Sequence, residues 1–349
     1  MEARKKTRTI YVGKVPIGGG NTIVVQSMTK TDTSDVKSTT KQIKSLEASG
    51  CEIIRLAVPD MNAAKALGKI KKSISIPMIA DIHFDWRLAL EAIKEGVDSL
   101  RINPGNIGAR WKIKEVVTAA GERGIPIRIG VNAGSLEKEL LKKYGHPNPE
   151  ALVESAGKHI QILEELKFTN IKVSLKASEV LKTVEAYRLF SERYDYPLHI
   201  GISEAGPPSS GIIKSSVGLG ILLSEGIGDT IRVSLTAKPE EEVRVAYEIL
   251  KSLGLRKKGV DIISCPTCGR CRIDLKGLAT KVEYRLRNID KPITIAVMGC
   301  VVNGPGEARG ADFGIAGGKG RGIIFKKGKI LKTVKEDELL EALLREIGI

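Results

Sequence analysis

The sequence predicts an α/β protein: a (β/α)8 barrel of the TIM type, followed by a small α+β domain. From residue 23 to about residue 237, short β-branched runs alternate with amphipathic segments of helical length, and eight such units are present. Eight units over roughly 250 residues are typical of a closed parallel barrel. The alternation stops near residue 255, where a charged segment and then a cysteine motif begin. We therefore expect residues 1–255 to form the barrel and residues 256–349 to form the second domain.

Each of the eight predicted strands is a short apolar run followed by a helical pattern, and together they cover residues 23–28, 53–58, 76–82, 99–104, 126–132, 170–177, 197–204 and 230–237. Two of the helices carry clear end signals. The helix predicted over residues 148–166 opens with Asn-Pro, and the helix over residues 238–254 closes at Gly254. A doubly wound open sheet is the alternative fold, but no GxGxxG motif follows the first strand.

The second domain follows a charged linker over residues 255–261 and shows no βα repeat. Its pattern predicts, in order, a cysteine motif, a helix, a strand, a glycine-rich loop, a hairpin and a C-terminal helix. After the motif, these elements are expected over residues 275–289, 293–299, 303–322, 322–334 and 335–348. Two helices beside a few strands indicate a small α+β domain.

The composition excludes several classes of protein. Lys and Arg number 56 against 41 Asp and Glu, so the net charge of +15 suggests an anionic partner. Aromatic residues make up only 4%, and they are not interleaved with basic residues as in a protein that binds single-stranded nucleic acid. The N-terminus lacks the apolar core of a secretory signal, and no run approaches the roughly 20 apolar residues of a membrane helix. We therefore expect a cytoplasmic protein that binds neither nucleic acid nor membrane.

Basic residues occupy one face of several predicted barrel strands. Side chains alternate across a strand, and the apolar set should pack on the helices, which points the other set inward. That inward set contains Arg55, Arg101, Arg128, Lys176 and Arg232, and it also contains Asn132 and Ser234. Five converging cations would lose hydration and repel one another, at a cost of several kcal/mol each. Asp81 and Glu204 are too few to balance them.

The simplest counter-charge is a polyanionic ligand at the C-terminal end of the barrel, where barrel enzymes place their active sites. Arginine suits this role because its planar guanidinium binds phosphate oxygens in pairs. In the alternative interpretation, each arginine only caps a strand end and meets solvent.

The cysteines indicate a metal site in the second domain. Residues 264–274 read SCPTCGRCRID and contain Cys265, Cys268 and Cys271, while Cys300 follows in AVMGCVVNGPGEA. A zinc ribbon needs two CxxC pairs or added histidines, and no histidine lies in this domain. The CxxCxxC spacing is common in iron–sulfur proteins, although no C-x3-C-P run follows Cys271. Iron–sulfur is therefore favoured, and zinc held by the four thiolates is the alternative.

These cysteine motifs, behind a barrel that carries IADIHFD, RINPGN and RIGVNAGS, resemble the bacterial 4-hydroxy-3-methylbut-2-enyl diphosphate synthase family in its two-domain form. The resemblance covers essentially the whole chain. It implies an iron–sulfur oxidoreductase of the non-mevalonate isoprenoid pathway, with a barrel similar to that of dihydropteroate synthases. The implied reaction is a two-electron reductive ring opening and dehydroxylation of 2-C-methyl-D-erythritol 2,4-cyclodiphosphate to (E)-4-hydroxy-3-methylbut-2-enyl diphosphate.

The resemblance also implies one 4Fe-4S cluster per chain, held by Cys265, Cys268, Cys300 and Glu307. Cys271 has no counterpart in the family motif and is interpreted as a bystander. A carboxylate ligand exchanges more readily than a thiolate, so one iron could open to a substrate oxygen. From composition alone, Glu307 would be a surface carboxylate.

The barrel residues take their expected roles from the same resemblance. Glu204, at the end of the seventh strand, is our candidate proton donor, and Asp81 and His83 are expected to bind the substrate hydroxyls. A structural histidine at position 83, and an ion pair between Glu204 and Arg232, are the alternatives. The diphosphate is expected to bind to Arg55, Arg101, Arg128, Asn132, Lys176, Arg232 and Ser234.

The family further implies ferredoxin or flavodoxin as the electron donor, and a homodimer in which the cluster domain of one chain covers the barrel of its partner. Two rival functions remain at this point. One is a non-redox phosphosugar lyase or isomerase with a structural zinc domain. The other is a basic RNA-binding protein with a zinc module.

Overall fold

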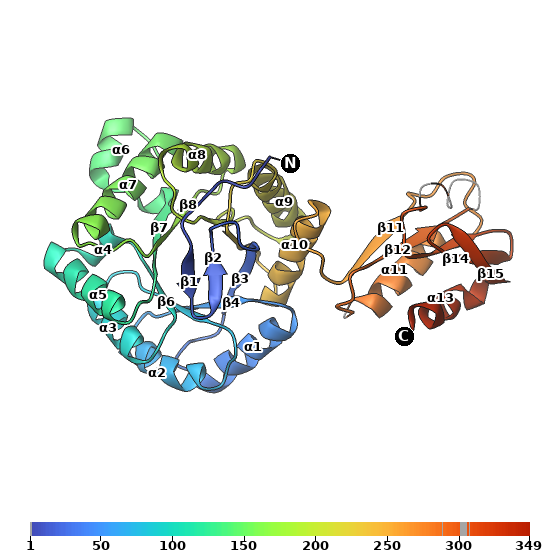
Figure 1. The fold of residues 1–349 in the computed structure, drawn as a ribbon, viewed down its shortest axis with the longest axis horizontal. Helices are drawn as coiled ribbons and strands as arrows, with labels where there is room; N and C mark the ends of the chain where they lie inside the picture. Colours follow the sequence, from blue (N-terminus) through green and yellow to red (C-terminus); the bar gives the residue numbers. More distant parts are fainter. Residues whose placement is uncertain (1, 288, 301–305, 307) are drawn as a thin grey trace. The chain divides into compact units, whose positions relative to one another are not determined.

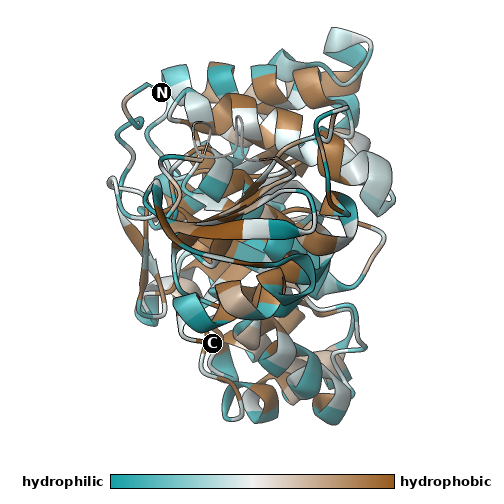
Figure 2. Cartoon of the chain, turned by 90° about the vertical axis from the view of Figure 1, so that its right-hand side faces the viewer, coloured by the Kyte–Doolittle hydropathy of each residue, from teal (hydrophilic) through white to brown (hydrophobic). Residues whose placement is uncertain are grey.

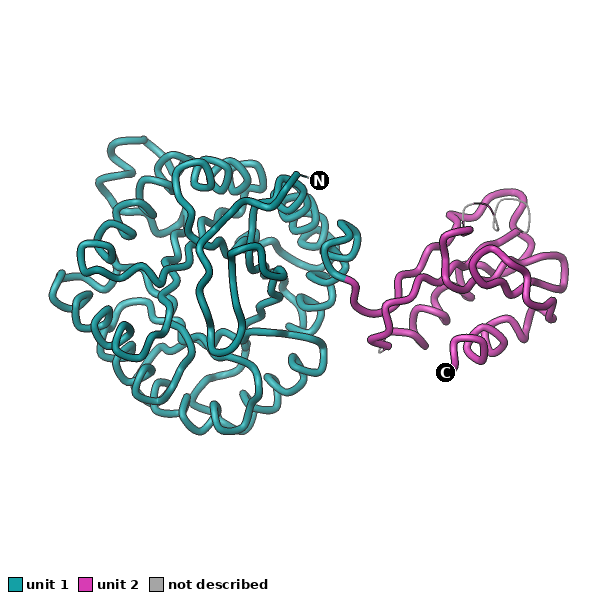
Figure 3. The backbone as a smooth tube through the Cα atoms, in the orientation of Figure 1, with its two compact units in different colours: residues 1–256 teal, residues 257–349 magenta. Residues whose placement is uncertain are grey.

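The computed structural model describes the chain except residues 1, 288, 301–305 and 307. It divides into two compact units, residues 1–256 and residues 257–349 (Figures 1 and 3). Each unit has its own hydrophobic core.

The first unit is a parallel eight-stranded barrel, which confirms the predicted fold class. Its strands are β3 (Val24–Met28), β4 (Ile53–Ala57), β5 (Met78–Asp81), β6 (Ser99–Ile102), β7 (Ile127–Asn132), β8 (Ile171–Lys176), β9 (His199–Ile200) and β10 (Thr230–Ile231). They are ordered β8-β7-β6-β5-β4-β3-β10-β9. A parallel bridge between Val173 and Leu198 joins the two ends of this order and so brings the ring close to closure.

Helices surround the strands (Figure 1): α1 (Val36–Ala48), α2 (Met61–Lys71), α3 (Trp86–Lys94), α4 (Pro104–Ile107), α5 (Arg110–Glu122), α6 (Lys138–Tyr144), α7 (Pro149–Glu165), α8 (Val180–Arg193), α9 (Pro208–Ser224) and α10 (Pro239–Ser252). The helices visible in Figure 2 carry both hydrophobic and hydrophilic residues, as is typical of amphipathic helices. The Asn-Pro signal is confirmed, because the Asn148 side chain accepts a hydrogen bond from the Ala151 N–H at the start of α7.

A short hairpin closes the N-terminal end of the barrel. It consists of β1 (Ile10–Val12) and β2 (Val15–Ile17), which the sequence patterns did not predict. Its apolar side chains form one cluster with Val24, Ile53 and Ile79, which lie near the beginnings of three barrel strands. This cluster covers the beginnings of those strands, which favours ligand entry from the other end, where the strands finish.

The described residues of the second unit form a five-stranded mixed sheet that is accompanied by helices. The strands, in spatial order, are β11 (Val260–Ser264), β12 (Ile293–Met298), β13 (Phe313–Gly317), β14 (Arg321–Lys326) and β15 (Lys329–Lys335). The helices α11 (Leu275–Leu286) and α13 (Leu339–Ile347) contribute buried leucines to its core. No helix in the described part of either unit has the length and apolar character needed to cross a bilayer.

The prediction of a continuous glycine-rich loop over residues 303–322 is wrong, because β13 lies within it. The glycines allow close packing in this strand, because a Cβ atom at Gly314 would lie 2.2 Å from the Phe325 ring on β14. The predicted linker is also shorter than expected, because β11 begins at Val260.

Candidate active site at the C-terminal end of the barrel

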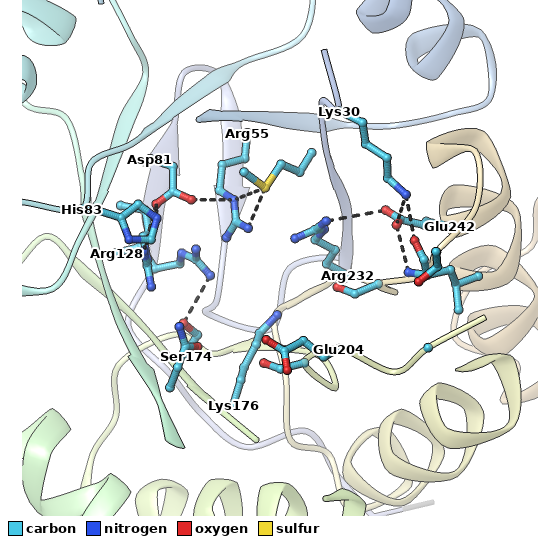
Figure 4. Close-up of a pocket in the computed structure, with 18 residues that line it drawn as sticks. Lys30, Arg55, Asp81, His83, Arg128, Ser174, Lys176, Glu204, Arg232 and Glu242 are labelled. Atoms are coloured by element: carbon cyan, nitrogen blue, oxygen red, sulfur yellow. Dashed lines mark hydrogen bonds and ion pairs between the residues drawn. The ribbon is translucent and has the colours of Figure 1, made fainter. Parts of the chain in front are cut away.

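A pocket of about 410 Å³ opens at the C-terminal ends of the barrel strands (Figure 4). The structure brings all ten barrel residues predicted for the site into its lining: Arg55, Asp81, His83, Arg101, Arg128, Asn132, Lys176, Glu204, Arg232 and Ser234. Several cationic side chains point into the same central space from different strands (Figure 4).

Asp81, at the end of β5, is the centre of one ion-pair network. Its Oδ1 accepts a hydrogen bond from Arg101 Nη1 at 3.0 Å, and its Oδ2 lies 3.5 Å from Arg55 Nε. Burial raises the pKa of Asp81, but the charge of Arg55, the neighbouring His83 and the charge of Arg101 outweigh it and hold the pKa far below the usual range. Asp81 is therefore ionised, and both of its oxygens orient arginines.

His83 lies at the rim of this network, with 53% of its side chain exposed. Its Nε2 is 3.7 Å from Asp81 Oδ1 and 3.3 Å from Arg101 Nη1. The exposed imidazole is therefore accessible to a ligand.

Arg128 and Lys176 carry charge that the described residues of the pocket do not balance. Arg128 is only 1% exposed, and its Nη1 donates one hydrogen bond, to Ser174 Oγ at 3.2 Å. Burial, together with Arg55 and Arg101, lowers the pKa of Arg128 well below its ordinary value. Burial and Arg128 do the same to Lys176. An arginine stays protonated at neutral pH even so, which leaves a buried positive charge in need of an anion.

Two glycines make room for these cations inside the barrel. A Cβ atom at Gly130 would lie 2.5 Å from Arg101 Nε, and one at Gly201 would lie 2.7 Å from Lys176 Nζ. A larger residue at either position would displace a charged group of the pocket.

Glu242 and Lys30 also line the pocket, and sequence reasoning missed both. Glu242, on α10, is 2.9 Å from Lys30 Nζ and 3.8 Å from Arg232 Nη2, and it accepts a hydrogen bond from the Leu235 N–H. The carboxylate that pairs with Arg232 is therefore Glu242. A signal existed in the sequence, because Glu242 stands four and eight residues before Ala246 and Leu250 on the buried stripe of α10.

Glu204 is exposed at the mouth of the pocket, and its backbone is strained. Its φ of 51° is left-handed, a conformation that few residues other than glycine adopt. Such strain persists where the surrounding structure enforces it, and it is concentrated at functional positions.

In the second unit, two of the predicted metal ligands follow neighbouring strands. Cys265 comes directly after β11 and Cys300 comes two residues after β12, and these strands pair in parallel with Ser264 opposite Val297. The two cysteines therefore begin loops at the same edge of the sheet. Cys268 is exposed, and Thr267 beside it has a left-handed φ of 64°, a rare conformation for a β-branched residue.

The donor chemistry of this edge suits a thiolate-bound cluster. The Gly299 N–H points at Cys265 Sγ at 3.4 Å, and backbone hydrogen bonds to sulfur tune iron–sulfur clusters. Glu307 lies outside the described residues. Within the described residues, no three His, Cys, Asp or Glu side chains are gathered closely enough to hold a metal ion.

Cys271 lies in the same region but makes different contacts. Its Sγ donates to the Ile273 carbonyl at 3.3 Å, and the side chain packs on the core of the second unit. A Cβ atom at Gly299 would lie 2.5 Å from this sulfur, so Cys271 fills the space beside the residue that precedes Cys300.

Comparison with known proteins gives matches along both units. Residues 7–247 match the GcpE TIM-barrel domain, and residues 261–348 match the GcpE protein C-terminal domain. A protein of Thermodesulfovibrio yellowstonii named 4-hydroxy-3-methylbut-2-en-1-yl diphosphate synthase (flavodoxin) is 68% identical over 347 residues, which cover 99% of each chain. A Geobacter sulfurreducens protein of the same name is 63% identical over 99% of this chain and 98% of its own.

Among solved structures, Yersinia pestis dihydropteroate synthase matches with a TM-score of 0.51 and 10% identity, over 70% of this chain and 98% of its own. At that identity the likeness concerns the barrel fold alone.

Proposed function

Because this chain belongs to the GcpE family, we propose that it is an iron–sulfur oxidoreductase that forms (E)-4-hydroxy-3-methylbut-2-enyl diphosphate from 2-C-methyl-D-erythritol 2,4-cyclodiphosphate. The relatives named above take their name from this product. The structural observation that carries the proposal is the excess of positive charge in the barrel pocket.

The excess of positive charge follows from a count of the charged side chains that line the pocket. Six cationic side chains line the described pocket, against three carboxylates, so the difference is three: Lys30, Arg55, Arg101, Arg128, Lys176 and Arg232 against Asp81, Glu204 and Glu242. A cyclic diphosphate carries about two negative charges, and ring opening leaves a terminal phosphate that raises the total to about three. The pocket therefore favours the charge that develops during the reaction over that of the substrate, which is how binding energy accelerates a chemical step.

The chemistry requires one bond to phosphate to break and one hydroxyl to leave. The C2–O bond of the ring breaks, the C3 hydroxyl departs as water, and a double bond forms between C2 and C3. Two electrons and one proton balance the reaction when the product carries the additional negative charge. We propose that the Glu204 carboxyl, which is exposed at the pocket mouth, donates the proton. Arg128 and Lys176 would bind the departing phosphate.

The electrons would come from a 4Fe-4S cluster when it is bound, delivered one at a time. We propose Cys265, Cys268, Cys300 and Glu307 as its ligands, one cluster per chain. The thiol-rich sheet edge and the Gly299 N–H directed at Cys265 support this choice.

We propose flavodoxin as the electron donor, because the relatives' names specify it, with ferredoxin as the alternative. A homodimer whose cluster unit serves the partner's barrel is part of the same proposal. We place the protein in the cytoplasm, where thiols stay reduced.

Metal analysis combined with turnover tests this function. Anaerobically purified protein should be brown, dithionite should bleach it, and the reduced protein should convert the cyclic diphosphate to the linear product. The Glu204→Gln variant is the matched control, because it should keep the colour and the iron while turnover is lost. Colourless protein with stoichiometric zinc and no turnover would instead favour the non-redox barrel enzyme. A steep dependence of RNA affinity on salt would favour the nucleic-acid binder.

A further inference from the structure

A second lysine of β8 lies deeper in the barrel than the pocket. Lys172, Ser174 and Lys176 alternate on the interior side of this strand, and the last two line the pocket whereas Lys172 does not. Lys172 is 1% exposed and stands opposite Arg128 in the strand register. Its ammonium has no hydrogen-bond partner within the described part of the chain.

Other buried polar groups of the barrel interior are also incompletely satisfied. Gln26 on β3 uses neither atom of its amide, and Arg128 Nε and His199 Nε2 have no partner among the described groups. The other ring nitrogen of His199 is 2.8 Å from Thr230 Oγ1. Buried polar groups of this kind normally bind ordered water. The barrel interior beneath the pocket therefore holds buried polar groups without partners among the described residues, unlike the apolar cluster at the hairpin.

The charges that face Lys172 are mostly positive. Arg128 on β7 and Arg55 on β4 repel its ammonium, while Asp229, just before β10, attracts it. Asp229 is already engaged, because Arg4 lies 2.9 Å away and the Leu198 N–H also binds it. The remaining titratable neighbours are Lys176 on β8 itself and His199 on β9, whose pKa burial and these cations push well below its ordinary value.

We propose that Lys172 is a proton-accepting site coupled to the anion site above it: a dianion bound among Arg55, Arg128 and Lys176 draws a proton onto the Lys172 amine. The inference rests on the anion-binding pocket of the proposed function. The physical reason is that the bound anion offsets the arginine charges that otherwise disfavour a second buried cation.

The direction of the pH dependence follows from the ligand-free state. Burial and Arg128 lower the pKa of Lys172 to about 7. Anion binding raises that pKa, so above pH 7 each binding event takes up a proton, and affinity falls as pH rises until the pKa of the complex is passed. The proton on the Lys172 amine would lie on β8, the strand next to the one that carries Arg128. The proposed reaction in this barrel consumes a proton.

Calorimetry with methanedisulfonate tests the coupling on the full cluster-loaded chain. This probe is a dianion whose own charge does not change near neutral pH, so every proton taken up comes to the protein. Titrations at one pH in buffers of different ionisation enthalpy give the number of protons per anion. A pKa of about 7 predicts an uptake at Lys172 of about 0.1 proton at pH 6 and about 0.9 proton at pH 8.

Two variants distinguish the effect of proton uptake at Lys172 from the effect of its positive charge on anion binding. Lys172→Arg keeps a permanent cation, so the anion should still bind but the uptake at pH 8 should fall by about 0.9 proton. Lys172→Met should lose the same uptake and bind more weakly at pH 6. The matched control is Lys138→Met, at an exposed lysine of α6, which should behave as the wild type.

The outcomes distinguish this inference from the proposed function. Anion binding by the wild type without an increase in proton uptake between pH 6 and pH 8 overturns the role of Lys172 and leaves the pocket intact. Undiminished uptake in Lys172→Arg does the same. A wild type that binds no methanedisulfonate overturns the anion site itself, and the inference with it.

Discussion

Replacement of Arg128 by methionine should have opposite effects on stability and on ligand binding. In the ligand-free barrel, the Arg128 guanidinium is almost fully buried, makes one hydrogen bond to Ser174 and is faced by Arg55 and Arg101. Methionine has a similar length and carries no charge to desolvate. Exchanges of buried charge for apolar side chains commonly stabilise a protein by about 1–4 kcal/mol, so we expect the free energy of unfolding to rise by an amount in that range.

The same substitution should weaken anion binding. A hydrogen bond to a charged group contributes about 1.5–3 kcal/mol, and each 1.4 kcal/mol is a factor of ten, so the Kd for inorganic pyrophosphate should rise roughly 10- to 150-fold. The KM for the cyclic diphosphate should rise with it. Arg128→Ala should lose at least roughly 2 kcal/mol of binding, but its cavity would obscure the gain in stability.

Two measurements on the Arg128→Met variant test these expectations for stability and for anion binding. Urea unfolding without ligand gives the stability, and calorimetric titration with pyrophosphate gives the Kd. Arg123→Met, at an exposed arginine after α5, is the matched control and should change neither quantity appreciably. A variant that is less stable without ligand yet binds pyrophosphate normally would show that Arg128 is a structural residue and that the anion binds elsewhere.

Three further outcomes are expected. Cys271→Ser should retain iron and visible absorbance whereas Cys300→Ser should lose both, because Cys300 is one of the proposed ligands and Cys271 is not. The reverse pattern in iron analysis would mean that the ligand set is wrong. Glu204→Gln should lower kcat by about 10²- to 10⁴-fold, with little change in the Kd for pyrophosphate, because the lost function is proton transfer; an equal loss of binding would instead make Glu204 a ligand-binding residue. Below pH 7, Lys172→Met should unfold at a higher urea concentration than the wild type, because the folded-state pKa of this lysine is lowered to about 7 and its positive charge costs stability below that pH. This difference in stability should shrink as pH rises from 7 towards 10. A difference that does not depend on pH would contradict the assignment.

The alternation of side chains along the strands was enough to predict most of the charged residues that line the barrel pocket. It separates interior from exterior positions, so the basic residues on the side opposite the apolar set had to converge, and they do so in one pocket. Alternation does not give depth along the barrel axis, however. Lys172 shares its side of β8 with Lys176, yet Lys176 lines the pocket whereas Lys172 is buried outside it.

Tertiary packing decided what the sequence patterns could not predict. Glycine-rich segments usually form loops, but β13 is a strand because Gly314 leaves room for the Phe325 ring and Gly317 for Ile273, and because its backbone pairs with strands on both sides. Glu242 is one of three consecutive acidic residues in the first turn of α10, where acidic residues are expected for the helix dipole. Only the orientation of that helix on the barrel directs Glu242, among the three, towards Lys30 and Arg232.

The charge imbalance of the pocket connects these features physically. A ligand-free barrel that holds three more cations than carboxylates in its lining carries an electrostatic cost, and the interior glycines and the helix carboxylate Glu242 keep the cations in place against it. That cost is relieved in proportion to the negative charge that enters, so a ligand whose charge grows during the reaction is bound most tightly late in the reaction. The cations that carry this cost are therefore the same residues to which we assign ligand binding, so apolar substitutions that stabilise this interior should diminish activity.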